Sequence, residues 1–352
     1  MDSGTSAPTL ITLDQIRAAA ARIAPYVSAT PIVPLSRGGP GLKAENLHPV
    51  GAFKLRGAFN ALLSLSPAAL AKGVVAHSSG NHAQAVAYAA HVLGTRAVIV
   101  MPDNAPAAKL AGTRGWGAEV VVVGSASAER AAKADALVES EGLTLVPPFN
   151  ALEIIAGTGT IAVEILRDRP DVERVAIPVS GGGLLSGVAA GLKLSNPNVR
   201  VIAVEPELAD DAARSFRAGR LISITAEEAG RTIADGLRVQ QLGAVNWPHV
   251  QAFVDEVVTV SEDAIKDAMR RIASGARLVA EPSGAVALAG LLSLGGAMDR
   301  SVAILSGGNV DLDVYARILA GGLGGVQASF DTAAARLAQD DENGGRQNQS
   351  SC

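Results

Sequence analysis

Short apolar runs rich in β-branched residues alternate with alanine-rich stretches of helical length along most of the chain. Six of these runs have the composition of buried strands: Val74–His77, Ala97–Met101, Val120–Val123, Val175–Val179, Val201–Val204 and Val302–Leu305. Each is followed by glycine, proline or serine and then by a helix-like segment. This pattern of repeated βα units predicts an α/β protein with mostly parallel sheets.

Three further segments are predicted to be structural helices or a disordered tail, and we assign them no catalytic or binding role. Ala128–Ser140 and Ser261–Ser274 have the pattern of amphipathic surface helices, each opened by a serine suited to cap its first turn. From about Asp331 the chain is polar and free of aromatic residues, which predicts a disordered tail over residues 331–352.

Composition and charge narrow the class of protein. Apolar stretches such as Ala83–Ala90 are far shorter than the ~20 residues of a membrane span, and the N-terminus lacks the pattern of a signal peptide. A net charge of −4 gives no basic field for nucleic acid or an anionic membrane. The one cysteine, Cys352, cannot form an intrachain disulfide. We therefore expect a cytoplasmic enzyme without nucleic-acid or membrane partners.

Ligands of open parallel sheets gather at the carboxyl ends of the strands. The loops after Ala76, Val179 and Leu305 are the places to look for chemistry, and each carries an unusual motif.

Lys54 is one of seven lysines and stands between Phe53 and Leu55. Apolar neighbours desolvate an amine and lower its pKa, which favours attack on a carbonyl and formation of a Schiff base. The alternative is a lysine that extends to solvent from the first turn of a helix.

The segment Ser78–His82 leads from a predicted strand straight into an alanine-rich helix. Backbone N–H groups at a helix start, with short polar side chains, can bind a small carboxylate. A simple N-cap is the alternative, although five consecutive residues of this kind exceed what capping needs.

Two glycine-containing turns follow the other strands. Ser180–Gly183 passes into a helix and would offer several N–H groups to a single phosphate, without the sequence of a nucleotide-binding loop. Ser306–Asn309 places a serine where it could bond to a ligand ring. For both turns the alternative is a glycine turn that serves only its own geometry.

Four motifs taken together resemble, in order and spacing, the fold-type II pyridoxal-phosphate enzymes, which share the fold of the tryptophan synthase β chain. The motifs are FKLRGA (Phe53–Ala58), SSGNHAQ (Ser78–Gln84), SGGGLLSG (Ser180–Gly187) and SGGN (Ser306–Asn309). The resemblance covers the chain from about Ile11 to Leu323. Within this class of enzymes the chain resembles the serine/threonine dehydratase group. The resemblance implies two open α/β domains: a large cofactor-binding domain of residues 1–72 and 151–325, and a small domain of residues 73–150. The cofactor would lie in the cleft between them.

The resemblance also implies a role for each matching residue. Lys54 would bind pyridoxal 5′-phosphate covalently and Phe53 would pack on its ring. Asn81 would bond to the ring oxygen O3′, and Ser306 would face the pyridine nitrogen. The phosphate would be held by Ser180, Gly181, Gly182, Gly183 and Leu184. The substrate carboxylate would be held by Ser78, Asn81 and His82.

Two positions depart from the pattern of the group, and one motif has an open role. Ser180 stands where a fourth glycine is more common, and Ala52 where serine commonly precedes the Phe-Lys pair. Neither change removes a reacting group, because the phosphate is held by the backbone. Thr232–Gly236 and Glu281–Gly284 are also shared with the group, and Glu281 would face the cofactor or the substrate without a defined role.

An acidic segment after the strand Val201–Val204 offers hard oxygen ligands. These are the carboxylates of Glu205 and Asp211 and the carbonyl of Ala209. Their spacing alone also fits a solvated acidic turn. The resemblance to serine racemases and related dehydratases implies a divalent cation, Mg²⁺, Ca²⁺ or Mn²⁺.

The resemblance implies a lyase that dehydrates and deaminates a small amino-acid substrate, L-threonine or L-serine, to a 2-oxo acid and ammonia. Two alternatives remain open: a 3-hydroxyaspartate dehydratase, and a serine racemase in which Ser79 is the second acid/base. A protein that only binds a phosphate ligand would have no use for the Lys54 amine. Homodimers are usual in the group, so we expect a homodimer.

Overall fold

A computed structural model of the protein describes residues 9–321 other than 79, 106 and 125, without the side chains of residues 107, 108 and 127. The chain divides into two units, with the boundary between Asn309 and Val310. The second unit contains helix α14 (Leu312–Ala320), whose start is capped by the Asp311 side chain. The predicted tail, residues 331–352, lies outside the described residues.

The first unit contains a six-stranded sheet whose strands are ordered β1-β2-β10-β7-β8-β9. Only β1 and β2 pair antiparallel, and every other neighbouring pair is parallel. The strands are β1 (Ile32–Pro34), β2 (Gly41–Ala44), β7 (Arg174–Pro178), β8 (Arg200–Pro206), β9 (Glu256–Val260) and β10 (Ser301–Leu305).

The same unit contains a smaller, fully parallel sheet ordered β5-β4-β3-β6. Its strands are β3 (Val74–His77), β4 (Ala97–Pro102), β5 (Glu119–Val123) and β6 (Thr144–Leu145). This sheet falls within the range 73–150 expected for a small domain, and the division into domains itself stays a prediction.

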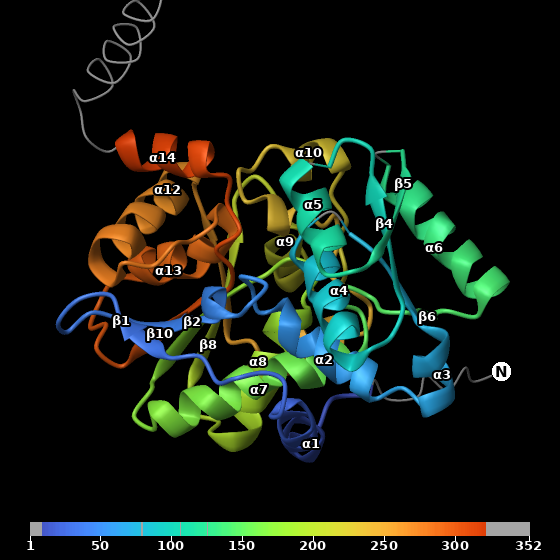
Figure 1. Ribbon diagram of the computed structural model, residues 1–352. Helices are drawn as coiled ribbons and strands as arrows, with labels where there is room; N and C mark the ends of the chain where they lie inside the picture. The colour runs from blue at the N-terminus through green and yellow to red at the C-terminus, as the bar shows by residue number, and fades with distance from the viewer. Residues whose placement is uncertain (1–8, 79, 106, 125, 322–352) are drawn as a thin grey trace, which may run out of the picture. The chain divides into compact units, whose positions relative to one another are not determined.

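Helices cover both faces of each sheet, as Figure 1 shows for α12 and α13 on one side of the larger sheet and α7 and α8 on the other. Three helices precede the strands of the smaller sheet in the sequence: α1 (Leu13–Ile23), α2 (Lys54–Leu63) and α3 (Pro67–Lys72). Three more connect its strands: α4 (Asn81–Leu93), α5 (Ala107–Gly115) and α6 (Ser127–Glu141). After it follow α7 (Leu152–Asp168), α8 (Gly183–Ser195), α9 (Asp211–Ala218), α10 (Ala226–Gly230), α11 (Trp247–Phe253), α12 (Glu262–Arg271) and α13 (Pro282–Leu294). Shorter pieces are the 3₁₀ turns Glu45–Leu47 and Asp235–Leu237 and the π turn Ile272–Ala276.

The six predicted strands are confirmed as β3, β4, β5, β7, β8 and β10, with ends within two residues of those expected. The predicted cap of α12 is also confirmed, because the Ser261 hydroxyl accepts from the N–H of Ala264. The prediction of a capping serine for α6 is wrong: its N-cap is Ala126, whose methyl side chain cannot accept a hydrogen bond. Four short strands, β1, β2, β6 and β9, were not predicted.

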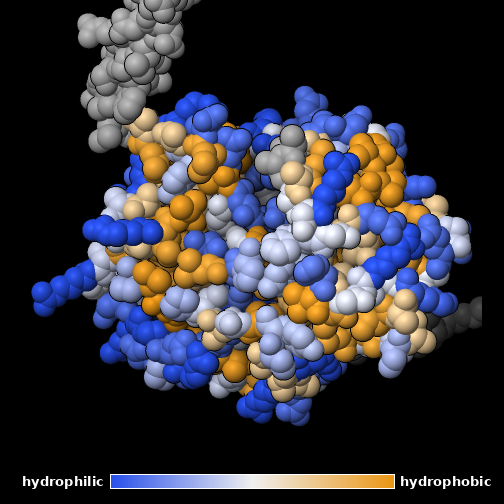
Figure 2. All heavy atoms as spheres, in the orientation of Figure 1, coloured by the Kyte–Doolittle hydropathy of each residue, from blue (hydrophilic) through white to orange (hydrophobic). Residues whose placement is uncertain are grey.

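The edge strand β5 leaves apolar surface uncovered. Val122 is 47% exposed, and Figure 2 shows an apolar area over this part of the molecule. Among the described residues, no helix combines the length and the apolar character that crossing a membrane requires.

Candidate active site

A cavity of about 220 Å³ lies where the carboxyl ends of β3, β7 and β10 meet the start of α2. The three loops singled out from the sequence therefore come together. The cavity wall includes every residue expected to contact cofactor or substrate that the structure describes: Phe53, Lys54, Ser78, Asn81, His82, Ser180, Gly181, Gly182, Gly183, Leu184 and Ser306. Ser79 lies outside the described residues.

Lys54 is the first residue of α2, and its amine stays inside the protein. Nζ donates a hydrogen bond to the carbonyl of Pro148 at 2.6 Å and lies 5.1 Å from the centroid of the Phe53 ring. Burial lowers the pKa of Lys54 to about 8. This environment differs from that of a lysine extending to solvent, and it fits an amine kept ready for nucleophilic attack.

The segment before Lys54 is tied to the turn after β10. The N–H of Phe53 donates to the carbonyl of Ser306 at 3.0 Å, and Ala52 forms an isolated antiparallel bridge with Gly307. These backbone bonds join two motifs about 250 residues apart in sequence and place both in the cavity wall.

A buried ionic cluster anchors the helix that carries Lys54. Arg56, which is 1% exposed, donates to both carboxylate oxygens of Glu45 at 2.7 and 2.9 Å and to those of Glu164 at 2.6 and 2.9 Å. Lys43, which is fully buried, also contacts Glu164 at 2.5 Å. Bidentate pairs of this kind fix direction as well as distance, so they orient the first turn of α2.

The glycine loop after β7 leads directly into α8. Gly182 has a φ of +96°, in the region that favours glycine. The first N–H groups of α8, which begins at Gly183, have no acceptor within the helix. The helix dipole favours an anion at this end, so the loop is suited to bind a phosphate.

Close packing sets the position of that loop. A Cβ atom on Gly181 would lie 2.5 Å from the Phe149 ring, and one on Gly183 would lie 2.9 Å from Phe149 Cβ. At these two positions packing against Phe149 therefore requires glycine. In contrast, the buried hydroxyl of Ser180 has no hydrogen-bond partner among the described residues. An unpaired buried hydroxyl in a cavity wall indicates a ligand contact.

The start of α4 has the form expected of a carboxylate-binding site. Ser78 Oγ accepts from the N–H of Gly80 at 3.2 Å, which holds the turn into the helix. His82 contributes less than its sequence position suggests. Its Nε2 donates to the carbonyl of Val146 at 2.9 Å, and burial together with the nearby Lys54 lowers the pKa of the imidazole to about 3. The ring is neutral, so its backbone N–H is the group suited to hold a carboxylate.

Comparison with known proteins identifies the family. A family model described as pyridoxal-phosphate dependent enzyme matches residues 23–307. The chain belongs to the pyridoxal-phosphate dependent enzymes. The resemblance carried by the four motifs is thereby confirmed, and so is the fold class, an α/β arrangement of two mostly parallel sheets.

Three similar proteins place the chain within this family. The serine racemase of Oryza sativa subsp. indica is 42% identical over 315 residues, covering 86% of this chain and 92% of that protein. The L-threonine ammonia-lyase of Thermotoga maritima is 44% identical over 283 residues, covering 80% of this chain and 70% of that protein. The solved structure of a threonine deaminase from T.th. has a TM-score of 0.81 and 43% identity, covering 86% of this chain and 99% of that one.

The acidic segment of this pyridoxal-phosphate enzyme forms a second polar site. Glu205 is the penultimate residue of β8 and accepts from the N–H groups of Ala212 and Ala213 at 3.1 and 2.9 Å. Both carboxylate oxygens of Asp211 are buried and lack a hydrogen-bond partner among the described residues. Burial raises the pKa of both groups, to about 7 for Asp211, and the charge of Asp211 adds to the effect at Glu205.

Sequence reasoning missed several residues of the cavity wall, among them Lys109, Phe149 and Asp235. Lys109 Nζ and Asp235 Oδ2 form an ion pair at 2.9 Å that joins α5 to the 3₁₀ turn Asp235–Leu237. The shared motif Thr232–Gly236 was the available signal for Asp235. Neither Lys109 nor Phe149 carries such a signal, because their roles arise from contacts with residues more than 30 positions away.

Proposed function

We propose that this enzyme catalyses the dehydration and deamination of L-threonine and L-serine to the corresponding 2-oxo acid and ammonia. The observation that carries the proposal is the place of the Lys54 amine in the cavity wall that also holds the glycine loop and the start of α4. A reactive amine beside a phosphate receptor and a carboxylate receptor matches the needs of an amino-acid substrate and this cofactor.

The residues present fit pyridoxal phosphate. The unpaired Ser180 hydroxyl and the free N–H groups of the α8 start suit a phosphate. Lys54 is the amine for covalent attachment, and Phe53 lies beside it with its ring partly buried. Ser306 offers a neutral hydroxyl, 4% exposed, where an acidic residue would instead hold a ring nitrogen protonated.

Pyridoxal phosphate, when bound, supplies the electron sink that makes the α C–H bond of an amino acid acidic. The N–H groups at the start of α4 hold the substrate carboxylate and fix the orientation of the α-carbon. The Lys54 amine, with its pKa lowered to about 8, is partly neutral near neutral pH and takes the α-proton as general base. Ser306, a neutral hydroxyl, would not hold a proton on the ring nitrogen of that cofactor, and this would favour loss of the β-hydroxyl.

The test is a Lys54→Ala variant with a Lys72→Ala control, a lysine of α3 outside the cavity wall. Lys54→Ala should lose the visible absorption band of the bound cofactor and lose 2-oxo acid production from serine and threonine. Lys72→Ala should keep both. Oxo acid production at the wild-type rate by Lys54→Ala would contradict the proposal.

A second candidate function is amino-acid racemisation. It is supported by the similarity to a protein named serine racemase and by Ser79 in the sequence, since a hydroxyl there is available as the second acid/base. The test is chiral chromatography of serine incubated with the wild type and with Ser79→Ala. D-serine that depends on Ser79 favours the racemase, and oxo acid alone favours the lyase. Including 3-hydroxyaspartate among the substrates tests the third alternative.

We also propose a divalent cation, Mg²⁺, Ca²⁺ or Mn²⁺, bound by Glu205, the Ala209 carbonyl and Asp211. Two adjacent buried carboxylates are costly when both are ionised, and a cation would compensate their charge. The described residues contain no group of three or more His, Cys, Asp or Glu side chains suited to a metal, so a backbone carbonyl would complete the set. The cation should raise the melting temperature of the wild type over that in chelator, and Asp211→Asn should abolish this difference.

The homodimer implied by the family resemblance remains a prediction. Sedimentation equilibrium of the full chain tests it, and a mass equal to one chain at micromolar concentration would contradict it.

A further inference from the structure

Glu281 is a buried carboxyl group of the cavity wall that the mechanism above does not use. It occupies the N-cap of α13, a position where an acidic side chain commonly bonds to the first N–H groups of the helix. Here the side chain makes no such bond. Its Oε1 instead accepts from Nδ2 of Asn81, the first residue of α4, at 2.7 Å.

Asn81 is held on its other side as well. Asn309 Nδ2 donates to Asn81 Oδ1 at 2.8 Å and to the carbonyl of Val50 at 2.7 Å. The Asn81 amide is therefore fixed in one orientation. Asn309 Nδ2, which also donates to Val50, requires the Asn81 oxygen on its side, and this leaves Nδ2 of Asn81 to face Glu281. One of its two amide hydrogens is used by Glu281, and the second remains for a ligand in the cavity that Asn81 lines.

Two glycines make room for this arrangement. A Cβ atom on Gly307 would lie 2.2 Å from Glu281 Oε1, and one on Gly284 would lie 2.1 Å from the Gly307 carbonyl. The Glu281 N–H also donates to that carbonyl at 3.1 Å. The start of α13 and the turn after β10 are thus packed backbone to backbone around the Glu281 carboxyl, which leaves it little freedom to move.

We propose that Glu281 is a positioning residue whose carboxyl group fixes the amide of Asn81, keeping the second amide N–H available to the ring of pyridoxal phosphate. The inference rests on the proposed function, because it requires that cofactor in the cavity. Glu281 acts through Asn81 and is not itself the group that reacts.

The surroundings of Glu281 favour its neutral form. Burial raises the pKa of Glu281 to about 8, and Asp235 of the facing 3₁₀ turn acts in the same direction. The bond from Asn81 and the charge of Lys109 on α5 act against this shift. At neutral pH the group is mostly a protonated acid that still accepts from Asn81, so glutamine is a close replacement in shape and bonding.

Two variants distinguish the loss of the hydrogen bond to Asn81 from a change in side-chain size at position 281. Glu281→Gln keeps the acceptor and the shape, while Glu281→Met keeps the size and loses the acceptor. Both are reconstituted with pyridoxal phosphate, and the readouts are the cofactor dissociation constant and the visible absorption and circular dichroism of the bound cofactor. Glu281→Gln should resemble the wild type. Glu281→Met should bind cofactor about tenfold more weakly, the effect of one hydrogen bond, with a shifted visible band.

Coupling to Asn81 gives the decisive measurement. Asn81→Ala should shift the band in the same way, and Glu281→Met should add little to it, since both changes remove the same interaction. Equal spectra of Glu281→Met and wild type, or fully additive effects with Asn81→Ala, would overturn the inference.

The Asn309→Ala variant tests the orientation of the Asn81 amide without altering Glu281. It removes the other bond to Asn81 and should weaken cofactor binding with the same spectral shift, and an unchanged band would count against the fixed amide. If the wild type itself shows no cofactor band, the proposed function fails, and this outcome is distinct from failure of the Glu281 inference.

Discussion

At the scale of single residues, Lys54 shows how burial alone changes the chemistry of a side chain. A lysine in water has a pKa near 10.4, so about one amine in a thousand is neutral at pH 7.4. Burial lowers the pKa of Lys54 to about 8, which makes a substantial fraction neutral at the same pH. The rate at which the apoprotein takes up pyridoxal phosphate should therefore rise with pH and level off just above 8.

This dependence is measured by following the growth of the visible cofactor band after mixing at several pH values. A rate that kept rising towards pH 10 would indicate an ordinary solvated lysine and contradict the role of burial. Lys54→Arg serves as the control, because it keeps a cation in the cavity and should show no uptake at any pH.

At the scale of elements, the position of α2 depends on the Arg56 cluster and not on local helix signals. The N-cap of α2 is Phe53, which offers no capping side chain. Arg56→Leu would leave the fully buried Glu45 without its bidentate partner, although Glu45 also lies 3.1 Å from the His48 ring. The free energy of unfolding in urea should fall by about 3–5 kcal/mol.

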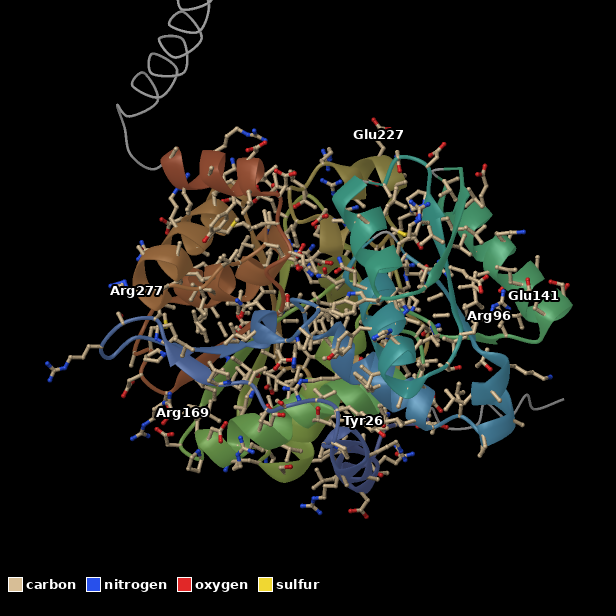
Figure 3. The ribbon with its side chains drawn as sticks, viewed as in Figure 1. Tyr26, Arg96, Glu141, Arg169, Glu227 and Arg277 are labelled. Atoms are coloured by element: carbon tan, nitrogen blue, oxygen red, sulfur yellow. The ribbon has the colours of Figure 1, made fainter. Side chains whose placement is uncertain are left out.

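A surface arginine provides the matched control for that change. Arg96 pairs with Glu119 and Glu141 at 2.7 and 2.5 Å, and Figure 3 shows Arg96 and Glu141 next to each other at the end of α6. The Arg96 side chain is 39% exposed, so Arg96→Ala should cost less than about 1 kcal/mol. Equal costs for Arg56→Leu and Arg96→Ala would show that the buried cluster does not anchor α2.

The same contrast explains what could be predicted from the sequence. It was possible to predict the strands β3, β7 and β10 and the motifs that follow them. A buried parallel strand and a glycine turn each depend on residues that are consecutive in the sequence. Phe149 beneath Gly181 and the bonds from Arg56 to Glu164 were not predictable, because they join residues 32 and 108 positions apart. The reduced role of the His82 ring is a similar case, since it follows from the Val146 carbonyl, 64 positions away.

At the scale of the whole first unit, the cavity is bordered by elements of both sheets, and the ion pair between Lys109 and Asp235 links them across it. Lys109 lies on α5 beside the smaller sheet, and Asp235 lies in a turn bonded to α13 of the larger sheet through the Gly236 N–H and Ser283 Oγ at 2.9 Å. The two side chains are 26% and 45% exposed, so the pair contributes at most about 1 kcal/mol and is screened by salt.

Lys109→Ala should therefore leave the melting temperature nearly unchanged while raising the KM for serine about two- to fivefold, the equivalent of about 0.5–1 kcal/mol. The same rise should be seen in the wild type when NaCl is increased from 0.1 to 1 M, because the Debye length falls from about 10 to 3 Å. Lys109→Ala should show little further response to salt. A variant as salt-sensitive as the wild type would mean that other charges govern access to the cavity, and that the two sheets are held around it by packing alone.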